Sequence, residues 1–181
     1  MAALEDIFLI IFYVATVIPT LLMVKETKTR LRNIKEGLKS LVWLPLTIGG
    51  LGVYIFFAMD FLSTIPILNW SWLGYNVAIG PYADAGFLGV APFVPMLVYM
   101  LIHVNYFEEM YFRKNWWMTV AWAFLHVAMG VAVHVALALL PIGFLYKHIY
   151  KKKGLNHAYA LHFATNMIVV TLSILSYFVV F

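Results

Sequence analysis

Long apolar runs, separated by short segments that hold most of the charge, are the feature that most limits what this chain can fold into. A helix of about 20 apolar residues crosses the hydrocarbon core of a bilayer, and several such runs occur here. With 64% hydrophobic residues, 11% charged residues and a mean hydropathy of +0.90, the 181-residue chain is too apolar for a soluble domain. The sequence therefore predicts an all-α, polytopic transmembrane helical bundle, in one domain covering residues 1–181.

We expect about six spans, some of them short or broken. They cover about residues 7–24, 41–62, 87–107, two helices within 116–146, and 155–181. The two helices within 116–146 have only about 15 residues each, so we expect them to be tilted, or broken near Gly130 or Pro141. The glycine cluster of 49–52 allows close helix approach or a local bend.

The basic residues predict the orientation. Segment 25–39 holds six Lys or Arg residues against two Glu residues, whereas 63–86 has no Lys or Arg. By the positive-inside rule, 25–39 is cytoplasmic and both termini lie outside. We expect 25–39 to be an interfacial helix that touches anionic headgroups, with membrane lipids as partners and bound lipid in place. The net charge of +4 therefore indicates membrane orientation and no nucleic-acid partner.

Two adjacent carboxylates, Glu108 and Glu109, follow the third apolar run, and Arg113 comes shortly after them. Ionisable groups at membrane depth cost roughly 2.5 to 3.5 kcal/mol each on insertion scales, so they indicate an ion pair or a function. On a helix, Glu109 and Arg113 share one face four residues apart, which suits an ion pair. Glu108 has no obvious local cation and is therefore the candidate for chemistry.

Two further polar pairs lie on other apolar helices. Trp122 precedes His126 by four residues and His162 precedes Asn166 by four, so each pair shares a helix face. Together with the carboxylates, these pairs can converge on one intramembrane polar cavity. There a carboxylate can deprotonate water, an imidazole can protonate a leaving amine, and an asparagine amide can donate to an oxyanion. A single membrane histidine, by contrast, is more often a hydrogen-bonding group between helices.

The order and spacing of these residues resemble the three motifs of the CPBP family, the intramembrane proteases related to the CAAX prenyl endopeptidase, also called the Abi family. The matching residues are Glu108-Glu109-x-x-x-Arg113, Trp122-x-x-x-His126 and His162-x-x-x-Asn166. The resemblance covers about residues 93–170. It departs at Trp122, where the family usually has phenylalanine, and this difference reshapes the cavity more than it removes chemistry.

The resemblance implies an intramembrane endopeptidase that cuts near the cytoplasmic face with a glutamate-activated water, and a peptide or prenylated peptide as substrate. The catalytic residues that it implies are Glu108, His126, His162 and Asn166, with Glu109 and Arg113 in orienting roles. Such chemistry requires no metal in principle. Glu108, His126 and His162 are nevertheless a candidate zinc site, because two imidazoles and a carboxylate are the ligands of many zinc hydrolases.

Two other classes of function stay open. A noncatalytic subunit would keep this fold and bind partner membrane subunits of a larger complex, with lipids or pigments in its grooves. A haem or electron-transfer protein would use facing histidines such as His126 and His162, but it leaves the carboxylates and Asn166 unexplained. We expect structural or solvated roles for the other histidines, which are His103, His134, His148 and His157. The chain has no cysteine, which excludes disulfides and thiolate chemistry.

Overall fold

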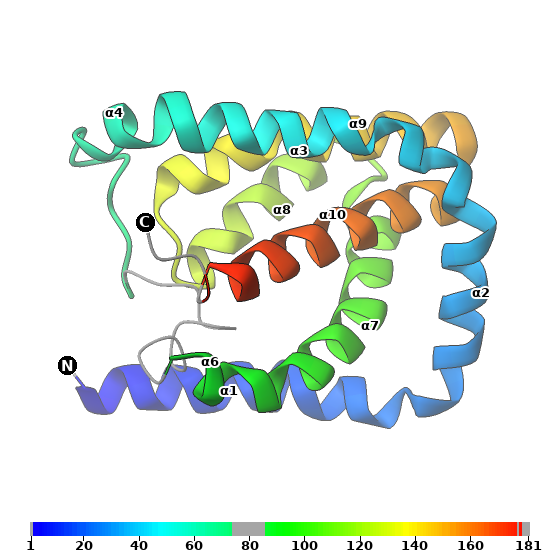
Figure 1. Cartoon of the computed structure of the whole chain (residues 1–181), viewed down its shortest axis with the longest axis horizontal. Coiled ribbons are helices and arrows are strands. Elements are labelled where there is room, and N and C mark those ends of the chain that lie inside the picture. The colour runs from blue at the N-terminus through cyan, green and yellow to red at the C-terminus, as the bar shows by residue number, and fades with distance from the viewer. Residues whose placement is uncertain (1, 74–85, 177, 179–181) are drawn as a thin grey trace.

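The computed structural model of the chain describes residues 2–73, 86–176 and 178, and within these residues it contains helices and no strand (Figure 1). The predicted all-α fold is confirmed. Residues 74–85 of the predicted outer loop, and 177 and 179–181 of the predicted last span, lie outside the described residues. The first half of the chain forms α1 (Ala2–Leu22), η1 (Val24–Glu26), α2 (Thr27–Gly37), η2 (Leu38–Trp43), α3 (Leu44–Val53), the π-helix η3 (Tyr54–Ala58) and α4 (Met59–Ser63).

The second half contains the helices that carry the predicted motifs. They are α6 (Gly86–Val90), η4 (Ala91–Phe93), α7 (Val94–Phe112), α8 (Trp116–Ala128), α9 (Val133–Lys153) and α10 (Leu155–Leu175). Among the described residues, four helical stretches are long and apolar enough to cross a membrane: Val24–Ser63, Gly86–Phe112, Val133–Lys153 and Leu155–Leu175. Helix α8 is apolar but shorter. These lengths and compositions support a membrane protein.

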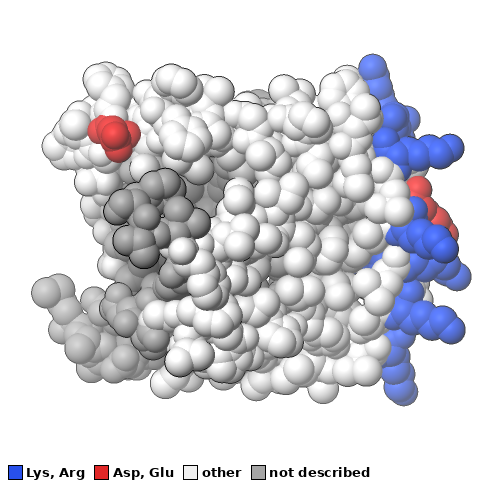
Figure 2. Space-filling view, viewed as in Figure 1, with Lys and Arg blue, Asp and Glu red and all other residues white. Residues whose placement is uncertain are grey.

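Helix α2 runs across one edge of the bundle, at the right of Figure 1. Figure 2 shows that Lys and Arg side chains gather along this same edge. Helix α1 begins, and α10 ends, toward the opposite side of the molecule. The predicted basic segment 25–39 is therefore helical and lies at one end of the bundle, while the compartment that this end faces stays a prediction.

The two short helices that we expected within 116–146 are in fact unequal. Helix α8 has 13 residues, and α9 has 21 because it continues through Pro141 to Lys153. The break lies at Gly130, whose φ of 95° is in the left-handed region that favours glycine. A membrane helix tolerates an internal proline when neighbouring groups satisfy the freed carbonyl, and the lysines of its last turn suit the negative end of the helix dipole. Hydropathy alone therefore ended this helix too early.

The glycines at which helices approach closely are not those of the 49–52 cluster. A Cβ built at Gly49, Gly50 or Gly52 would meet no heavy atom within 4 Å, and the helix changes to π-helix at Tyr54–Ala58 soon after. The close approach instead occurs at Gly37, where a Cβ would collide with the carbonyl oxygen of Asn156. This contact sets α2 directly against the first turn of α10.

The apolar core lies where α8, α9 and α10 meet. Its buried members are Trp122, Ala123, Ile142, Tyr146, Ile149, Ala158 and Leu161. Helix α7 packs against α10 beside this core. The C-terminal end of α7, with Glu108 and Glu109, and the second turn of α10, with His162, are therefore brought together.

Candidate functional site

His162 joins both carboxylates of the first motif. Its Nδ1 lies 2.9 Å from Oε1 of Glu109, and its Nε2 lies 3.6 Å from Oε2 of Glu108. His162 is 3% exposed and comes from α10, whereas both glutamates lie in the last two turns of α7. Residues more than fifty positions apart in the sequence thus meet at one buried point.

Glu109 and Arg113 form the ion pair that their spacing predicts. Arg113 Nε donates to Oε1 and Oε2 of Glu109, at 3.0 and 3.1 Å, and Nη2 lies 2.8 Å from Oε1. Both side chains are 0% exposed. The guanidinium also lies over the ring of Trp122, with its Cζ 4.1 Å from the ring centroid. A buried carboxylate and a buried guanidinium require such mutual pairing, because an uncompensated charge is costly to bury.

These contacts determine which nitrogen of His162 carries the proton. Glu109 is held as an acceptor by Arg113, so Nδ1 of His162 is the donor in the 2.9 Å hydrogen bond. In the neutral ring, Nε2 then has its lone pair directed toward Glu108. The 3.6 Å between Nε2 and Glu108 exceeds the length of a direct hydrogen bond, and a water can bridge groups at such a separation.

Glu108 has a different environment from Glu109. Its side chain is 20% exposed, and it lines a cavity of about 190 Å³ between α1 and α7. Glu109 is sealed in the interior by its two partners. The structure therefore separates the roles of the adjacent carboxylates, one buried and paired and the other facing open space.

Asn166 lies one turn after His162 and pairs with a residue that our sequence analysis did not identify. Its Nδ2 donates to Oδ1 of Asn105, at 3.0 Å. Asn105 is 1% exposed, and its own Nδ2 is buried with no hydrogen-bond partner among the described residues. A signal was present, because Asn105 precedes Glu109 by four residues and so shares its helix face.

His126 makes its described hydrogen bond within its own helix, α8. Its Nδ1 is 2.9 Å from the carbonyl oxygen of Trp122, on its own helix. The Trp122 ring makes edge contacts with both histidine rings, at centroid distances of 4.9 Å to His126 and 5.6 Å to His162. Within the described part of the chain, no hydrogen bond or ion pair joins His126 to Glu108 or His162.

The candidate zinc site has two of its three ligands close together. Glu108 and His162 are neighbours, whereas His126 is bonded to the Trp122 carbonyl. No group of three or more His, Asp or Glu side chains in the described ranges is arranged to hold a metal ion. The bond from His126 uses only Nδ1, and zinc at these three residues stays a prediction.

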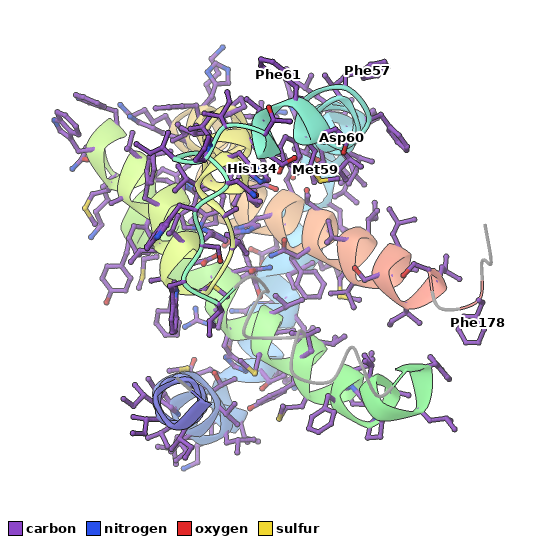
Figure 3. The ribbon with its side chains drawn as sticks, turned by 90° about the vertical axis from the view of Figure 1, so that its left-hand side faces the viewer. Phe57, Met59, Asp60, Phe61, His134 and Phe178 are labelled. Atoms are coloured by element: carbon purple, nitrogen blue, oxygen red, sulfur yellow. The ribbon has the colours of Figure 1, made fainter. Side chains whose placement is uncertain are left out.

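Two of the remaining histidines link helices. His103 Nε2 lies 3.2 Å from Oγ1 of Thr27, and His134 Nδ1 lies 2.5 Å from the Tyr54 hydroxyl. Both imidazoles are buried. Figure 3 shows His134 beneath the segment that carries Phe57 and Phe61. These contacts agree with the structural roles expected for both histidines.

No protein-family model, no curated protein and no solved structure matches this chain. The resemblance to the CPBP family therefore depends on the motif residues themselves. The geometry around His162 is the observation from which a function can be argued.

Proposed function

We propose that this chain is an intramembrane endopeptidase of the CPBP type, which hydrolyses a peptide bond with water activated by Glu108. The observation that carries the proposal is the contact of His162 with both carboxylates, through Nδ1 at 2.9 Å and Nε2 at 3.6 Å. A histidine oriented by one carboxylate and facing a second, more exposed one is suited to general acid–base chemistry.

The proposed reaction begins with a water between Glu108 and His162 Nε2. Glu108 takes one proton from this water while the water oxygen bonds to the carbonyl carbon of the scissile peptide. The carbonyl becomes an oxyanion, and the C–N bond breaks as the proton passes to the leaving nitrogen. Glu109 orients the imidazole throughout, and Arg113 keeps Glu109 ionised in the interior.

Asn166 is the proposed donor to the oxyanion. One of its amide hydrogens bonds to Asn105, which leaves the second for the substrate oxygen. Asn105 is then a positioning residue, because it fixes the plane of the Asn166 amide. His126 acts behind Trp122, where it can hold the tryptophan ring against His162.

The test is the replacement of Glu108 by glutamine, which keeps the size of the side chain and removes the base. Membranes that contain the wild-type chain and membranes that contain Glu108→Gln are compared by mass spectrometry of newly formed peptide N-termini. New termini are expected with the wild type and not with Glu108→Gln. The matched control is Glu36→Gln, which changes an exposed glutamate on α2 and should preserve every cleavage. Cleavage retained by Glu108→Gln would falsify the glutamate mechanism.

Zinc is tested on the same preparations by elemental analysis of the purified protein and of His126→Ala. If the wild type contains one metal ion per chain and His126→Ala contains none, His126 is a metal ligand. This result would support the predicted zinc site of Glu108, His126 and His162. Absence of metal from a preparation that cleaves would remove zinc from the proposal.

The alternative function is a noncatalytic subunit of a larger membrane complex. It predicts identical peptide termini with and without Glu108→Gln, and stoichiometric partner chains after gentle detergent extraction. A haem protein would show a Soret band on purification. In this structure both ring nitrogens of His162 face carboxylates, which supports the hydrolase more than haem ligation.

We also propose that the basic edge of the bundle faces the cytoplasm, with both termini on the other side. The support is the positive-inside rule together with the gathering of Lys and Arg at one end (Figure 2). Glu108 lies close to Arg113 and Lys114 in the sequence, so cleavage would occur near this face.

A further inference from the structure

One face of the His162 imidazole is covered by Tyr146 of α9. The two rings are nearly parallel, with an interplanar angle of 27° and their centroids 4.7 Å apart. Tyr146 is 1% exposed and belongs to the apolar core where α8, α9 and α10 meet. It belongs to none of the three sequence motifs. The site therefore includes a fourth helix, α9, through an aromatic contact.

The hydrogen bond of His162 to Glu109 does not by itself fix the plane of the imidazole. Nδ1 lies 2.9 Å from Oε1 of Glu109, whereas the 3.6 Å from Nε2 to Glu108 exceeds the length of a direct hydrogen bond. A ring held at one atom can rotate about that bond and carry its other nitrogen away from Glu108. A further contact is needed to keep Nε2 directed toward Glu108.

Tyr146 and Trp122 supply contacts from two directions. Trp122 meets the His162 ring edge-on, at an interplanar angle of 88° and a centroid distance of 5.6 Å, whereas Tyr146 lies along its face. The tyrosine and tryptophan rings also contact each other, with centroids 6.3 Å apart. Both are buried, and close packing leaves such rings little room to move. Rotation of the imidazole out of its plane would bring it into collision with Tyr146.

The surroundings also favour an aromatic ring over an aliphatic side chain at position 146. Cζ of Arg113 lies 5.5 Å from the centroid of the Tyr146 ring. A guanidinium within about 6 Å of a ring centroid is attracted by the electron-rich face of the ring. Leucine or methionine could fill much of the same space but would offer neither this attraction nor a flat surface for the imidazole.

We propose that Tyr146 is a positioning residue for His162, whose ring fixes the imidazole plane in which Nε2 faces Glu108. The inference rests on the proposed endopeptidase function. In that reaction the plane of the imidazole determines where the water between Nε2 and Glu108 lies. Tyr146 acts through His162 and does not itself contact the substrate.

The experiment examines the imidazole separately from cleavage. The purified chain, with nitrogen-15-labelled histidine, is placed in phosphatidylcholine nanodiscs. Solid-state NMR then determines which ring nitrogen of His162 carries hydrogen, at a pH where imidazoles are neutral. His162→Gln identifies the signals of this residue among the six histidines. The wild type is expected to show a single tautomer, with the hydrogen on Nδ1 and bonded to Glu109.

Tyr146→Leu removes the ring face and should give a mixture of the two tautomers of His162. Cleavage of a synthetic peptide that spans a wild-type cleavage site should slow by about tenfold or more, because small misplacements of reacting groups are costly. Tyr146→Phe keeps the ring and should keep both the single tautomer and the cleavage rate. Tyr146→Met repeats the test if Tyr146→Leu does not fold, because a flexible methionine fills irregular space.

Tyr159→Leu is the matched control. It also removes a fully buried tyrosine ring, but that ring packs edge-on against Tyr106, at a centroid distance of 5.4 Å. No ring contact joins Tyr159 to His162 among the described residues. The control should destabilise the fold and leave the tautomer of His162 unchanged.

Three results would overturn the inference. A single Nδ1–H tautomer in the leucine or methionine variant would show that the imidazole is held without Tyr146. The same mixture in Tyr159→Leu would assign the change to a general loosening of the core. A mixture in Tyr146→Phe would assign it to the hydroxyl group and not to the ring face.

The proposed function fails separately. If the tautomer depends on the Tyr146 ring but the wild type cleaves no peptide, the contact is retained and the enzyme is rejected. If the tautomer changes in Tyr146→Leu while cleavage continues at the wild-type rate, the enzyme is retained and the positioning role is rejected.

Discussion

Gly143 of α9 faces the indole ring of Trp122 on α8 so closely that a Cβ at position 143 would lie 2.8 Å from Cζ3 of the tryptophan. Trp122 is 2% exposed and also contacts Arg113 and His162. The glycine therefore makes room for a large ring at the position where the CPBP pattern has phenylalanine. The Trp122 ring in turn packs against the buried side chains of Arg113 and His162.

We expect Gly143→Ala to lower the free energy of unfolding by about 1–3 kcal/mol, because the added methyl overpacks the space that Trp122 fills. Denaturant unfolding in detergent micelles measures this change. Trp122→Phe in the same chain should recover part of the loss. Gly50→Ala is the matched control, because its Cβ would meet nothing within 4 Å and alanine favours the helix by up to about 1 kcal/mol. Equal destabilisation by both alanines would contradict the contact.

Arg113→Met should be among the most damaging single changes. It leaves the Glu109 carboxylate buried without its cation, which costs about 3–5 kcal/mol when one partner of a buried pair is removed. The double variant Glu109→Gln, Arg113→Met should be more stable than Arg113→Met alone, as the unfolding midpoints will show. Removal of the exposed pair Arg32–Glu36, 3.7 Å apart, should cost no more than about 1 kcal/mol. If the double variant loses as much free energy of unfolding as the two single variants together, Glu109 and Arg113 do not stabilise each other.

Gly37→Ala should separate α2 from α10. Its Cβ would collide with the backbone carbonyl of Asn156, which cannot rotate away as a side chain can. A movement of α2 away from α10 would also disrupt the hydrogen bonds of Ser40. The Ser40 hydroxyl lies 2.7 Å from the Gly37 carbonyl oxygen and 2.6 Å from the His157 carbonyl oxygen. Faster trypsin cleavage at the lysines of α2 is the expected result. Trypsin should cleave the control Gly52→Ala at the wild-type rate. If Gly37→Ala is also cleaved at the wild-type rate, α2 does not pack against α10 as closely as the structure shows.

The predicted topology can be tested with single cysteines in a chain that has none. Lys28 lies on α2 and Ile67, which is 75% exposed, follows α4. In right-side-out vesicles, a membrane-impermeant maleimide should label Ile67→Cys and spare Lys28→Cys, and inverted vesicles should reverse the result. Labelling of both cysteines from one side would disprove the orientation.

Glu108 and Glu109 should differ in stability as well as in activity. Glu108→Gln should change the free energy of unfolding by no more than about 1 kcal/mol, because Glu108 is partly exposed and 3.6 Å from its nearest partner. Glu109→Gln removes the charge that compensates buried Arg113 and should cost about 3–5 kcal/mol. Thermal unfolding of the two purified variants provides the comparison. A similar loss in both would mean that the carboxylates share one environment.

Features that depend on neighbours along the chain were predictable. The Glu109–Arg113 pair follows from a spacing of four on a helix, and the break at Gly130 follows from the lack of a side chain there. The hydropathy pattern located the apolar helices, but it placed the end of α9 before its lysines. Hydropathy measures apolar content, so it does not detect helical residues that are charged. Asn105 was missed because its partner, Asn166, comes from a helix 61 residues away in the sequence.

The sequence by itself determined an all-helical chain with apolar spans, one basic edge, and polar residues in helix-compatible pairs, since each depends on composition or on spacing within a turn. Only the tertiary structure decided which pairs meet. Helix packing brought His162 to both glutamates, placed Trp122 between the two motif histidines, and left Glu108 facing the cavity beside α1. Such contacts depend on the rotation and separation of whole helices, which distant residues such as Gly37 and Gly143 set through their lack of a side chain.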